Sequence, residues 1–396
     1  MVMSPTPFGE KSAISIIKRD VMECNLPFRG DTYDGCYHNC IYCYARCQKE
    51  FRNIWYTDNP RPADVDKLKN RFSLGFSFRG IGRKGDTYYV NRAINHRFPI
   101  RLGTQVDCFQ KCEKEYRVTY EFMKYLIEHN YPFMINTKSD IVAEDEYVDL
   151  MKKANTGYVV VQITLTSLDP TIRKVELRAP SPDRRLHALK VLSDEGIPTQ
   201  VRYSPIIPTL DYDAEDLLKQ AAECGAIDII TEYLRLSPFA AKRFNENIGW
   251  DLVKNVYEPH GHFSKSYYRL NKDYKFKRYK ELKEIAERFG LNFYVCSEED
   301  PSINNCENCC GTNKYRGFDN HNTAAANNIY RLIQKKGQLT LSDVKRYFWN
   351  IYWKEFERRW NAKEVENFLV NVEVKKTDGQ EARDEEGNLI YVYKED

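Results

Sequence analysis

Apolar residues follow two alternating patterns along most of the chain. Short runs rich in β-branched and aromatic residues predict buried strands, and apolar residues three or four positions apart, such as Phe122 and Leu126, predict helices facing a core. Gly196 and Gly290 follow two helical segments where a C-cap is typical. The predicted strands cover residues 100–104, 133–136, 158–164, 199–203, 227–234 and 291–295. The predicted helices cover residues 116–129, 144–153, 182–195, 214–224 and 274–289.

Strand and helix segments therefore alternate over the central two hundred residues. Repeated strand–helix units are typical of parallel strands joined by right-handed crossovers, so the pattern predicts an α/β fold. A short strand over residues 32–34 precedes them and leads into a cysteine-rich loop. Six or seven strands are fewer than a closed eight-stranded barrel needs, which predicts an open sheet.

The pattern breaks between residues 48 and 98, which we interpret as an insertion. Ten Arg or Lys and three Asp stand between Arg61 and Arg101, with Phe and Tyr interleaved. The segment Gly80 to Gly85 spells G-x-G-x-x-G, but it follows no convincing strand and opens no helix, so it does not indicate a dinucleotide site. We expect a flexible basic loop beside the active site, either a cradle for a phosphate backbone or a solvated surface insertion.

The pattern changes again after residue 321. Helices are expected over residues 324–334, 340–350 and 353–369, and segments 372–374 and 390–393 are expected to pair as a hairpin. This order resembles a winged helix-turn-helix, which places its third helix on duplex DNA; the alternative is a helical cap on the open barrel. The predicted domains are an N-terminal extension (1–30), a partial barrel (31–297, with its insertion at 48–98), a Cys-rich loop (298–321) and a small C-terminal α+β domain (322–396).

Composition narrows the function classes. With 60 basic and 57 acidic residues the net charge is +3, so any nucleic-acid surface must be local. No apolar run is long enough to span a membrane and the N-terminus has no signal-peptide core, which predicts a cytoplasmic protein without a membrane partner. Twelve cysteines in such a chain indicate metal or redox chemistry rather than disulfides.

The most informative motif is a loop with three cysteines at C-x3-C-x2-C spacing, Cys36, Cys40 and Cys43. A loop this short can turn three thiolates toward one point. Three thiolates do not close a tetrahedral zinc site, whereas a cubane iron–sulfur cluster held by three cysteines keeps one iron open. An open iron can chelate S-adenosylmethionine (SAM), and an electron from the cluster can then release a 5′-deoxyadenosyl radical. The alternatives are a structural zinc loop or three buried thiols.

This spacing, with aromatic Tyr42 before the last cysteine, resembles the signature of the radical SAM superfamily. His38 within the loop and Tyr44-Ala45-Arg46 after it resemble the spore photoproduct lyase-like group of that superfamily. The resemblance implies an open partial (β/α)6 barrel of the TIM type and a 4Fe–4S cluster on the three cysteines, with SAM on its open iron. It also implies an electron donor such as flavodoxin or ferredoxin.

In a barrel of parallel strands the site lies at the carboxyl ends of the strands. The second strand is followed by Gly103-Thr104, Asp107 and Gln110, which resemble the G-T-x-x-D-x-aromatic-Q pattern of the photoproduct lyase-like relatives. A lysine after the third strand can pair with the SAM carboxylate as a point charge. In relatives, a serine in the place of Ser167 contacts SAM. The predicted cofactor-binding residues are Tyr42 (near the adenine), Thr104, Asp107, Lys138, Gln162, Ser167 and Arg202.

Each of these polar residues has an ordinary alternative role in a helix cap, a turn or a strand-end hydrogen bond. The chain also departs from the relative that the motif resembles. Spore photoproduct lyase itself returns a hydrogen atom from a cysteine at the end of its second strand, and the matching position here is Thr104. Cys108 and Cys112 follow and are the candidate catalytic hydrogen donors; the alternative is a pair of half-buried thiols. We therefore expect a relative with another substrate.

A second cysteine group follows the last predicted strand. Cys296, Cys306, Cys309 and Cys310 fall within fifteen residues, in a stretch with the composition of a loop. Their C-x2-C spacing predicts a second metal site, either an iron–sulfur cluster or zinc, rather than free thiols. His321 is a further candidate ligand, whereas the isolated Cys24 is interpreted as a buried thiol.

The leading hypothesis is a radical SAM enzyme that abstracts a hydrogen atom from a nucleic-acid base, for repair or modification. The basic aromatic stretches, the insertion and residues 265–280, are suited to a phosphate-binding groove. One alternative is a radical SAM enzyme acting on a protein or peptide, with an auxiliary cluster on the second cysteine group. An alternative of another class is a non-catalytic, zinc-containing DNA- or RNA-binding protein.

Overall fold

The computed structural model describes most of the chain, including the whole predicted barrel apart from short gaps. The described residues are 13–16, 24–50, 58–79, 85–208, 210–252, 257–259, 268–296, 301–304, 308–319, 323–348, 356–358, 360, 361, 365, 369 and 372–394.

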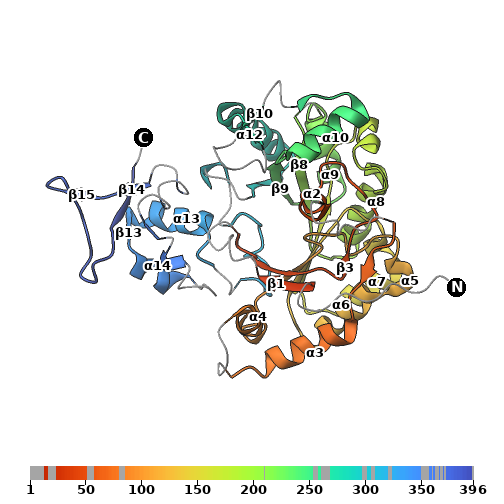
Figure 1. Cartoon of the computed structure of the whole chain (residues 1–396), viewed down its shortest axis with the longest axis horizontal. Coiled ribbons are helices and arrows are strands. Elements are labelled where there is room, and N and C mark those ends of the chain that lie inside the picture. Colours follow the sequence, from red (N-terminus) through yellow and green to blue (C-terminus); the bar gives the residue numbers. More distant parts are fainter. Residues whose placement is uncertain are drawn as a thin grey trace.

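The fold is built on an eight-stranded sheet with the order β1-β2-β5-β6-β7-β8-β9-β12 (Figure 1). All neighbouring strands are parallel except β1, which runs antiparallel to β2 at one edge. The edge strands β1 and β12 are not joined among the described residues, so the predicted open, partial barrel is confirmed. The strands are β1 (Ile14–Ile16), β2 (Phe28–Gly30), β5 (Ile100–Leu102), β6 (Phe133–Thr137), β7 (Val159–Thr164), β8 (Thr199–Ile206), β9 (Asp228–Tyr233) and β12 (Asn292–Val295).

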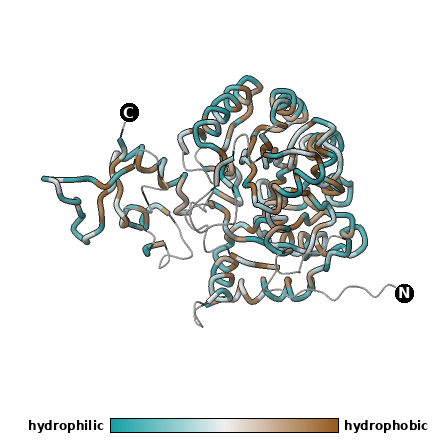
Figure 2. Tube along the Cα trace, turned by 45° about the horizontal axis from the view of Figure 1, so that its top comes forward, coloured by the Kyte–Doolittle hydropathy of each residue, from teal (hydrophilic) through white to brown (hydrophobic). Residues whose placement is uncertain are grey.

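Helices cover the outer face of the sheet, and Figure 2 shows hydrophobic strands enclosed by helices with hydrophilic outer turns. The five helices predicted for the barrel are present, with ends that differ by a few residues at most. The helices of the barrel are α5 (Glu113–Tyr116), α6 (Val118–Glu128), α7 (Asp145–Met151), α8 (Pro182–Asp194), α9 (Ala214–Glu223), α10 (Pro238–Ile248) and α12 (Lys272–Arg288). Smaller elements are β3 (Tyr33–Asp34), α2 (Tyr44–Glu50), β4 (Arg61–Pro62), β10 (Tyr257–Pro259) and β11 (Tyr268–Leu270).

The two faces of the sheet differ in chemistry. Ile163, Val201 and Ile229 point to the helices and belong to the main hydrophobic core. The residues before them in each strand, Gln162, Gln200 and Asp228, point to the inner, concave face. There, Gln162 Nε2 donates to Gln200 Oε1 at 2.7 Å, and Gln200 Nε2 donates to Asp228 Oδ2 at 2.9 Å. Parallel strands buried on both faces are usually apolar throughout, so this polar row marks the inside of the barrel.

The prediction of a flexible basic loop over residues 48–98 is wrong. Much of that segment forms α3 (Val65–Phe76) and α4 (Asp86–Asn95). Phe72 is fully buried, and its ring centroid lies 5.3 Å from that of Phe122 and 5.0 Å from that of Tyr131. Leu68 and Phe72 stand four residues apart and form the buried face of α3. Residues 80–84, with most of the G-x-G-x-x-G string, lie outside the described residues.

The first parallel strand also begins earlier than predicted. It is β2, which pairs with β5, whereas residues 33 and 34 form β3 and pair with β4. At the other end of the barrel, residues 308–319 form a loop against the amino ends of the strands. The amide of Gly317 donates to the carbonyl of Gly157, just before β7, and Lys314 Nζ lies 2.6 Å from Asp228 Oδ2 at the start of β9.

The C-terminal unit lies to one side of the barrel (Figure 1). It consists of α13 (Ala326–Lys336), β13 (Gln338–Leu339), α14 (Leu341–Tyr347), β14 (Val372–Val374), β15 (Lys376–Thr377), β16 (Gln380–Glu381) and β17 (Tyr391–Tyr393). Its main sheet has the order β13-β17-β14, and β15–β16 form a protruding hairpin. The predicted pairing of segments 372–374 and 390–393 is confirmed. The described helices and strands follow the predicted order; most of the predicted helix 353–369, which would be the third helix of a winged helix-turn-helix, lies outside the described residues.

Polar contacts join this unit to the barrel. Asn25, just before β2, accepts hydrogen bonds from Thr323 Oγ1 at 2.8 Å and Asn328 Nδ2 at 2.9 Å. Asn304 Nδ2 donates to Asn327 Oδ1 at 2.7 Å. In the described part of the chain, no helix has the length and apolar character needed to cross a membrane.

Candidate functional site

The three cysteines of the motif lie in one loop between β3 and α2. Cys36 and Cys43 are partly buried and Cys40 is buried. Burial raises the pKa of all three thiols. The pKa of Cys36 is raised further by Cys40 and Cys43, and that of Cys40 by Cys43, so the three sulfurs are electrostatic neighbours.

This donor set fits a cluster better than a single ion. Three thiolates leave a tetrahedral zinc ion one ligand short, whereas a cubane bound by three cysteines keeps one iron open. A zinc ion needs its sulfur ligands about 2.3 Å from one point, whereas a cubane separates its cysteines by its own width. Three neighbouring thiols in a short loop therefore suit a three-cysteine cubane.

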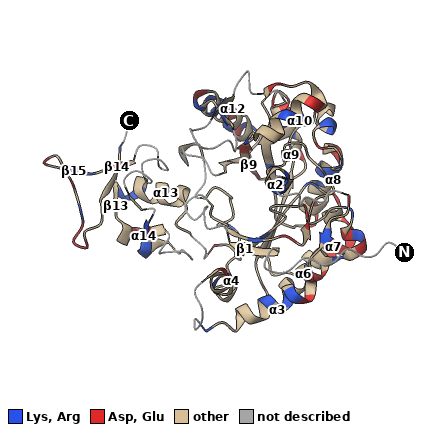
Figure 3. Ribbon diagram, in the orientation of Figure 1, with Lys and Arg blue, Asp and Glu red and all other residues tan. Residues whose placement is uncertain are grey.

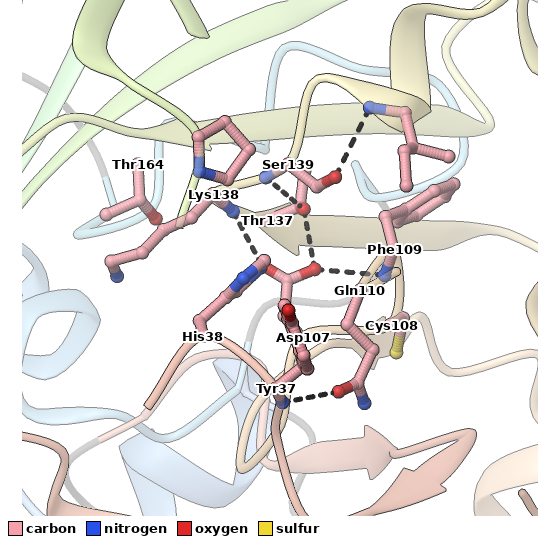
Figure 4. Close-up of polar contacts among 12 residues, drawn as sticks. Tyr37, His38, Asp107, Cys108, Phe109, Gln110, Thr137, Lys138, Ser139 and Thr164 are labelled. Atoms are coloured by element: carbon pink, nitrogen blue, oxygen red, sulfur yellow. Dashed lines mark hydrogen bonds and ion pairs between the residues drawn. The ribbon is translucent and has the colours of Figure 1, made fainter. Parts of the chain in front are cut away.

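Asp107 fixes the loop to the sheet (Figure 4). His38 Nε2 lies 3.1 Å from Asp107 Oδ2, which also accepts the Lys138 amide at 2.7 Å. Its Oδ1 accepts the Thr137 hydroxyl at 2.7 Å and the Phe109 amide at 2.9 Å. Burial by itself would raise the pKa of Asp107, but His38 and the donated hydrogen bonds outweigh it and lower the pKa to about 2. Asp107, predicted to bind the cofactor, here joins the loop to the ends of β5 and β6.

Gln110 fixes the same loop from a second direction. Its Oε1 accepts the Tyr37 amide at 2.7 Å, and its Nε2 donates to the carbonyl of Gly35 at 3.2 Å. The side chain is fully buried. The cysteine loop is thus fastened on both sides of Cys36 by the segment that follows β5.

A buried carboxylate holds the other half of the loop. Glu176 accepts hydrogen bonds from the Tyr42 hydroxyl, from Arg185 Nη2 and from the Thr166 hydroxyl. Lys138 Nζ lies 4.0 Å from Glu176 Oε1 and 5.6 Å from the centre of the Tyr42 ring. Burial opposes ionisation of Glu176, yet Arg185 and Lys138 lower its pKa to about 2. Tyr42 and Lys138, both predicted as cofactor residues, therefore meet at one anion.

Thr104 also lies at this edge of the sheet. Its carbonyl accepts the hydroxyl of Tyr44, the residue after Cys43, at 2.7 Å. The side chain of Asp31 accepts the amides of Thr104 and Gln105 at 3.0 and 2.9 Å, and the Thr104 hydroxyl at 3.1 Å. Asp31 was not singled out from the sequence. Its position directly after β2 is the signal, because carboxylates at strand ends often hold adjacent loops.

Three other predicted cofactor residues have mainly internal partners. Ser167 is fully buried and donates to Asp213 Oδ2 at 2.7 Å. Gln162 belongs to the polar row on the concave face, where its Oε1 has no hydrogen-bond partner among the described residues. Arg202 lies 3.1 Å from Glu232 and 3.7 Å from the sulfur of Cys296, so it belongs with the second cysteine group. Their contact with SAM stays a prediction.

The two candidate hydrogen donors differ in access. Cys108 is fully buried in the hydrophobic core. Cys112 is partly buried at the start of α5, and burial together with Glu113 raises its pKa to about 12. A hydrogen donor must reach the substrate, and Cys112 is the more accessible of the two. Their catalytic role stays a prediction.

A fourth thiol near the loop was missed. Cys47 lies in α2, four residues after Cys43. Its sulfur accepts hydrogen bonds from the Ser237 hydroxyl at 3.0 Å and from Arg243 Nη1 at 3.5 Å. Its spacing after Cys43 was visible in the sequence. The second cysteine group is partly described: Cys296, Cys309 and Cys310 lie on the concave side, whereas Cys306 and His321 fall outside the described residues.

Comparison with known proteins defines the class to which this site belongs. Residues 31–221, which contain the cysteine loop and the ends of the first strands, match the family described as the radical SAM superfamily. The match covers the part of the barrel that carries the cysteine motif and agrees with the family that the motif resembled.

Individual relatives are more distant. The chain is 30% identical over 179 residues to an uncharacterized protein of Methanocaldococcus jannaschii (45% of this chain, 60% of the relative). It is 27% identical over 217 residues to an uncharacterized protein of Mycobacterium tuberculosis (53% of this chain, 60% of the relative). It thus spans about 60% of the length of these curated relatives. A solved variant of spore photoproduct lyase shares the fold with a TM-score of 0.51 at 15% identity, over 72% of this chain and 80% of that one.

Proposed function

We propose that the protein is a radical SAM enzyme whose cluster is held by Cys36, Cys40 and Cys43. The bound cluster and SAM would supply reductive cleavage of the sulfonium and a radical that abstracts a hydrogen atom from the substrate. A small electron-transfer protein such as flavodoxin or ferredoxin would deliver the electron. The observation that carries the proposal is the three-thiol loop, fastened by Asp107 and Gln110 at the carboxyl ends of parallel strands.

The chain's own residues would orient the cofactors. Lys138 offers a positive charge for the SAM carboxylate. Glu176 would hold the Lys138 ammonium group and the Tyr42 hydroxyl in place. Asp107 and Gln110 keep the loop from moving when its thiolates bind iron. A rigid supporting shell matters because metal affinity typically falls about 10- to 100-fold when such second-shell groups are removed.

Anaerobic reconstitution tests this proposal. The wild-type protein should form 5′-deoxyadenosine from SAM when it is reduced with dithionite. Cys40→Ala should lose this activity, whereas Cys224→Ala should keep it because Cys224 caps α9 on the outer layer of the barrel. SAM cleavage by Cys40→Ala at the wild-type rate would show that the cluster lies elsewhere.

For the substrate, we propose a nucleic acid. The winged-helix order of the C-terminal unit supports this class, because such units dock a helix on the duplex. The charges favour the helical side: α14 has Lys345, which pairs with Glu357, and Arg346 in its last turn and one acidic residue, Asp343. Residues 375–387, which include the β15–β16 hairpin, have three basic and five acidic residues. On the barrel, basic and acidic residues are interspersed over α3, α7, α10 and α12 (Figure 3).

The acidic hairpin is also the observation that favours the second candidate, a protein or peptide substrate. Oligonucleotide binding at several salt concentrations separates the two. For a nucleic acid, affinity should fall as salt rises, and the slope should decrease by about one for each of Lys345→Ala and Arg346→Ala. Lys376→Ala in the hairpin is the matched control and should leave the slope unchanged. Affinity that does not respond to salt would favour the protein or peptide substrate.

A further inference from the structure

Four cysteines from three distant parts of the chain meet inside the barrel. Cys24 precedes β2, Cys296 follows β12, and Cys309 and Cys310 lie in the loop that covers the amino ends of the strands. All four are buried, with exposed fractions of 7%, 6%, 4% and 3%. Cys24, which looked like an isolated thiol in the sequence, therefore belongs with the second cysteine group.

We call these four residues the inner cysteine group (Cys24, Cys296, Cys309 and Cys310). Cys24, Cys309 and Cys310 pack in one cluster with Met134 and Val160, on the concave side of β6 and β7. Cys296 packs separately, against Ile230 and Tyr294, and is an electrostatic neighbour of Cys24 and Cys310. The sulfurs of Cys309 and Cys310 are 3.9 Å apart.

The loop that carries two of these thiols is held to the sheet. Gln200 Nε2 donates to the carbonyls of Cys310 at 3.1 Å and Gly311 at 3.3 Å. Gly311 also packs so tightly on Tyr294 that an added Cβ would lie 2.6 Å from its ring and hydroxyl. The backbone of the loop is therefore placed by two strands, β8 and β12, which flank β9 in the sheet.

Two arginines face the same thiols. Arg202 Nη2 lies 3.7 Å from the Cys296 sulfur. Arg101 is an electrostatic neighbour of Cys24, Cys296 and Cys310. The Nε of Arg101 is enclosed and has no hydrogen-bond partner among the described residues. A buried cation without compensation is costly, so this arrangement suits an anionic group in place of four neutral thiols.

We propose that the inner cysteine group binds an iron–sulfur cluster, separate from the one on Cys36, Cys40 and Cys43. Soft thiolates select zinc, copper(I) or iron–sulfur clusters, and the described group offers sulfur alone. The 3.9 Å between the Cys309 and Cys310 sulfurs is the separation of two thiolates on one tetrahedral metal, as on one iron of a two-iron cluster. The sulfide content measured below distinguishes this cluster from one zinc ion. A cluster with four thiolate ligands carries a net negative charge, which would compensate Arg101; Arg202 already pairs with Glu232.

The test uses a variant that lacks the three cysteines of the proposed SAM-binding cluster. The Cys36→Ala/Cys40→Ala/Cys43→Ala variant, reconstituted anaerobically, should keep about two to four iron atoms per chain with an equal amount of acid-labile sulfide. Adding Cys24→Ala and Cys309→Ala should remove nearly all of both. Adding Cys224→Ala instead should remove neither. Circular dichroism of each variant establishes that it is folded.

These outcomes separate the inner site from SAM cleavage, because the starting variant lacks the proposed SAM-binding cluster. Retention of one zinc per chain without sulfide, or loss of all iron from the triple variant, would overturn the proposal. Retention of the full iron and sulfide after Cys24→Ala alone would overturn the assignment of Cys24. If folding of the fivefold variant fails, Cys24→Ser in the triple variant gives the same readout with a smaller change in volume.

Discussion

The carboxylate of Glu176 is negatively charged and almost completely shielded from water. The residue is 1% exposed, and Arg185, which compensates it, is equally buried. Removing one member of such a pair typically costs about 3–5 kcal/mol, because the other charge remains buried without a partner. The pair also supports Tyr42 and Lys138, so its integrity matters for the geometry of the proposed SAM site.

The Glu176–Arg185 pair makes the free energy of unfolding depend on pH. The pKa of Glu176 falls from 4.5 to about 2 on folding, so its contribution is fully present above pH 4.5 and is lost as the pH falls toward 2. We expect the free energy of unfolding to drop by about 2 kcal/mol from this group between pH 6 and pH 3. Urea unfolding at several pH values measures this drop.

Glu176→Gln is the matching variant. At pH 7 it should be less stable than wild type by about 3–5 kcal/mol, and the acid-dependent part described above should disappear from its pH profile. Glu195→Gln is the control, since Glu195 forms an exposed pair with Lys152 and its loss should change stability little. Equal pH profiles for wild type and Glu176→Gln would contradict the role given to Glu176.

The residues that carry the chemistry differ in how visible they are in the sequence. The three cysteine ligands fall within eight residues, so their spacing alone indicates a site. Glu176 and Tyr42 are 134 positions apart, and Asp31 and Thr104 are 73 apart. Their contacts exist only after the strands have paired, so no local pattern predicts them. The same holds for Cys24, whose partners lie more than 270 positions away.

At the scale of elements, the turn after β5 depends on one glycine. Gly103 has φ +79°, and a Cβ there would lie 2.2 Å from the carbonyl oxygen of Asn136 in β6. This close approach brings the segment with Thr104, Asp107 and Gln110 against the end of β6. Asp107 and Gln110, which hold the cysteine loop, both follow this turn in the chain.

Gly103→Ala should therefore cost more than an ordinary glycine substitution. We expect a loss of about 2–5 kcal/mol in the free energy of unfolding, from backbone strain and from overpacking against Asn136. Gly196→Ala is the control: Gly196 has φ +72° but open space around it, so only strain of about 1–2 kcal/mol applies. Urea unfolding compares the two, and equal losses would show that the contact with Asn136 is unimportant.

Most elements of the barrel could be predicted because their apolar periodicity is regular. Residues 48–98 misled the prediction because eleven basic residues dominate the composition, while the buried face of α3 consists of only Leu68, Phe72 and Gly75. β2 is three residues long, and β13 is two. Strands this short have no measurable period, and their pairing with distant strands defines them.

At the scale of the whole molecule, the barrel and the C-terminal unit meet at Asn25. Asn25→Ala would leave Thr323 and Asn328 without their buried acceptor, which typically costs about 1–3 kcal/mol. We expect the C-terminal unit to separate from the barrel at lower temperature than in wild type. Differential scanning calorimetry should resolve two transitions in this variant.

The control for this prediction is Asn155→Ala, which removes an exposed hydrogen bond to Asn130. Its cost should be small, since water replaces the lost partner. A single, unshifted transition for Asn25→Ala would mean that the two parts are joined by other contacts.

The loop of residues 308–319 imposes an order on biosynthesis. It covers the amino ends of strands that were all translated before it, since β12 ends at Val295. A nascent chain therefore exposes the concave face of its sheet until the last quarter of the polypeptide leaves the ribosome. Because Cys309 and Cys310 lie in this loop, the proposed inner site is complete only after residues 308–319 have been translated.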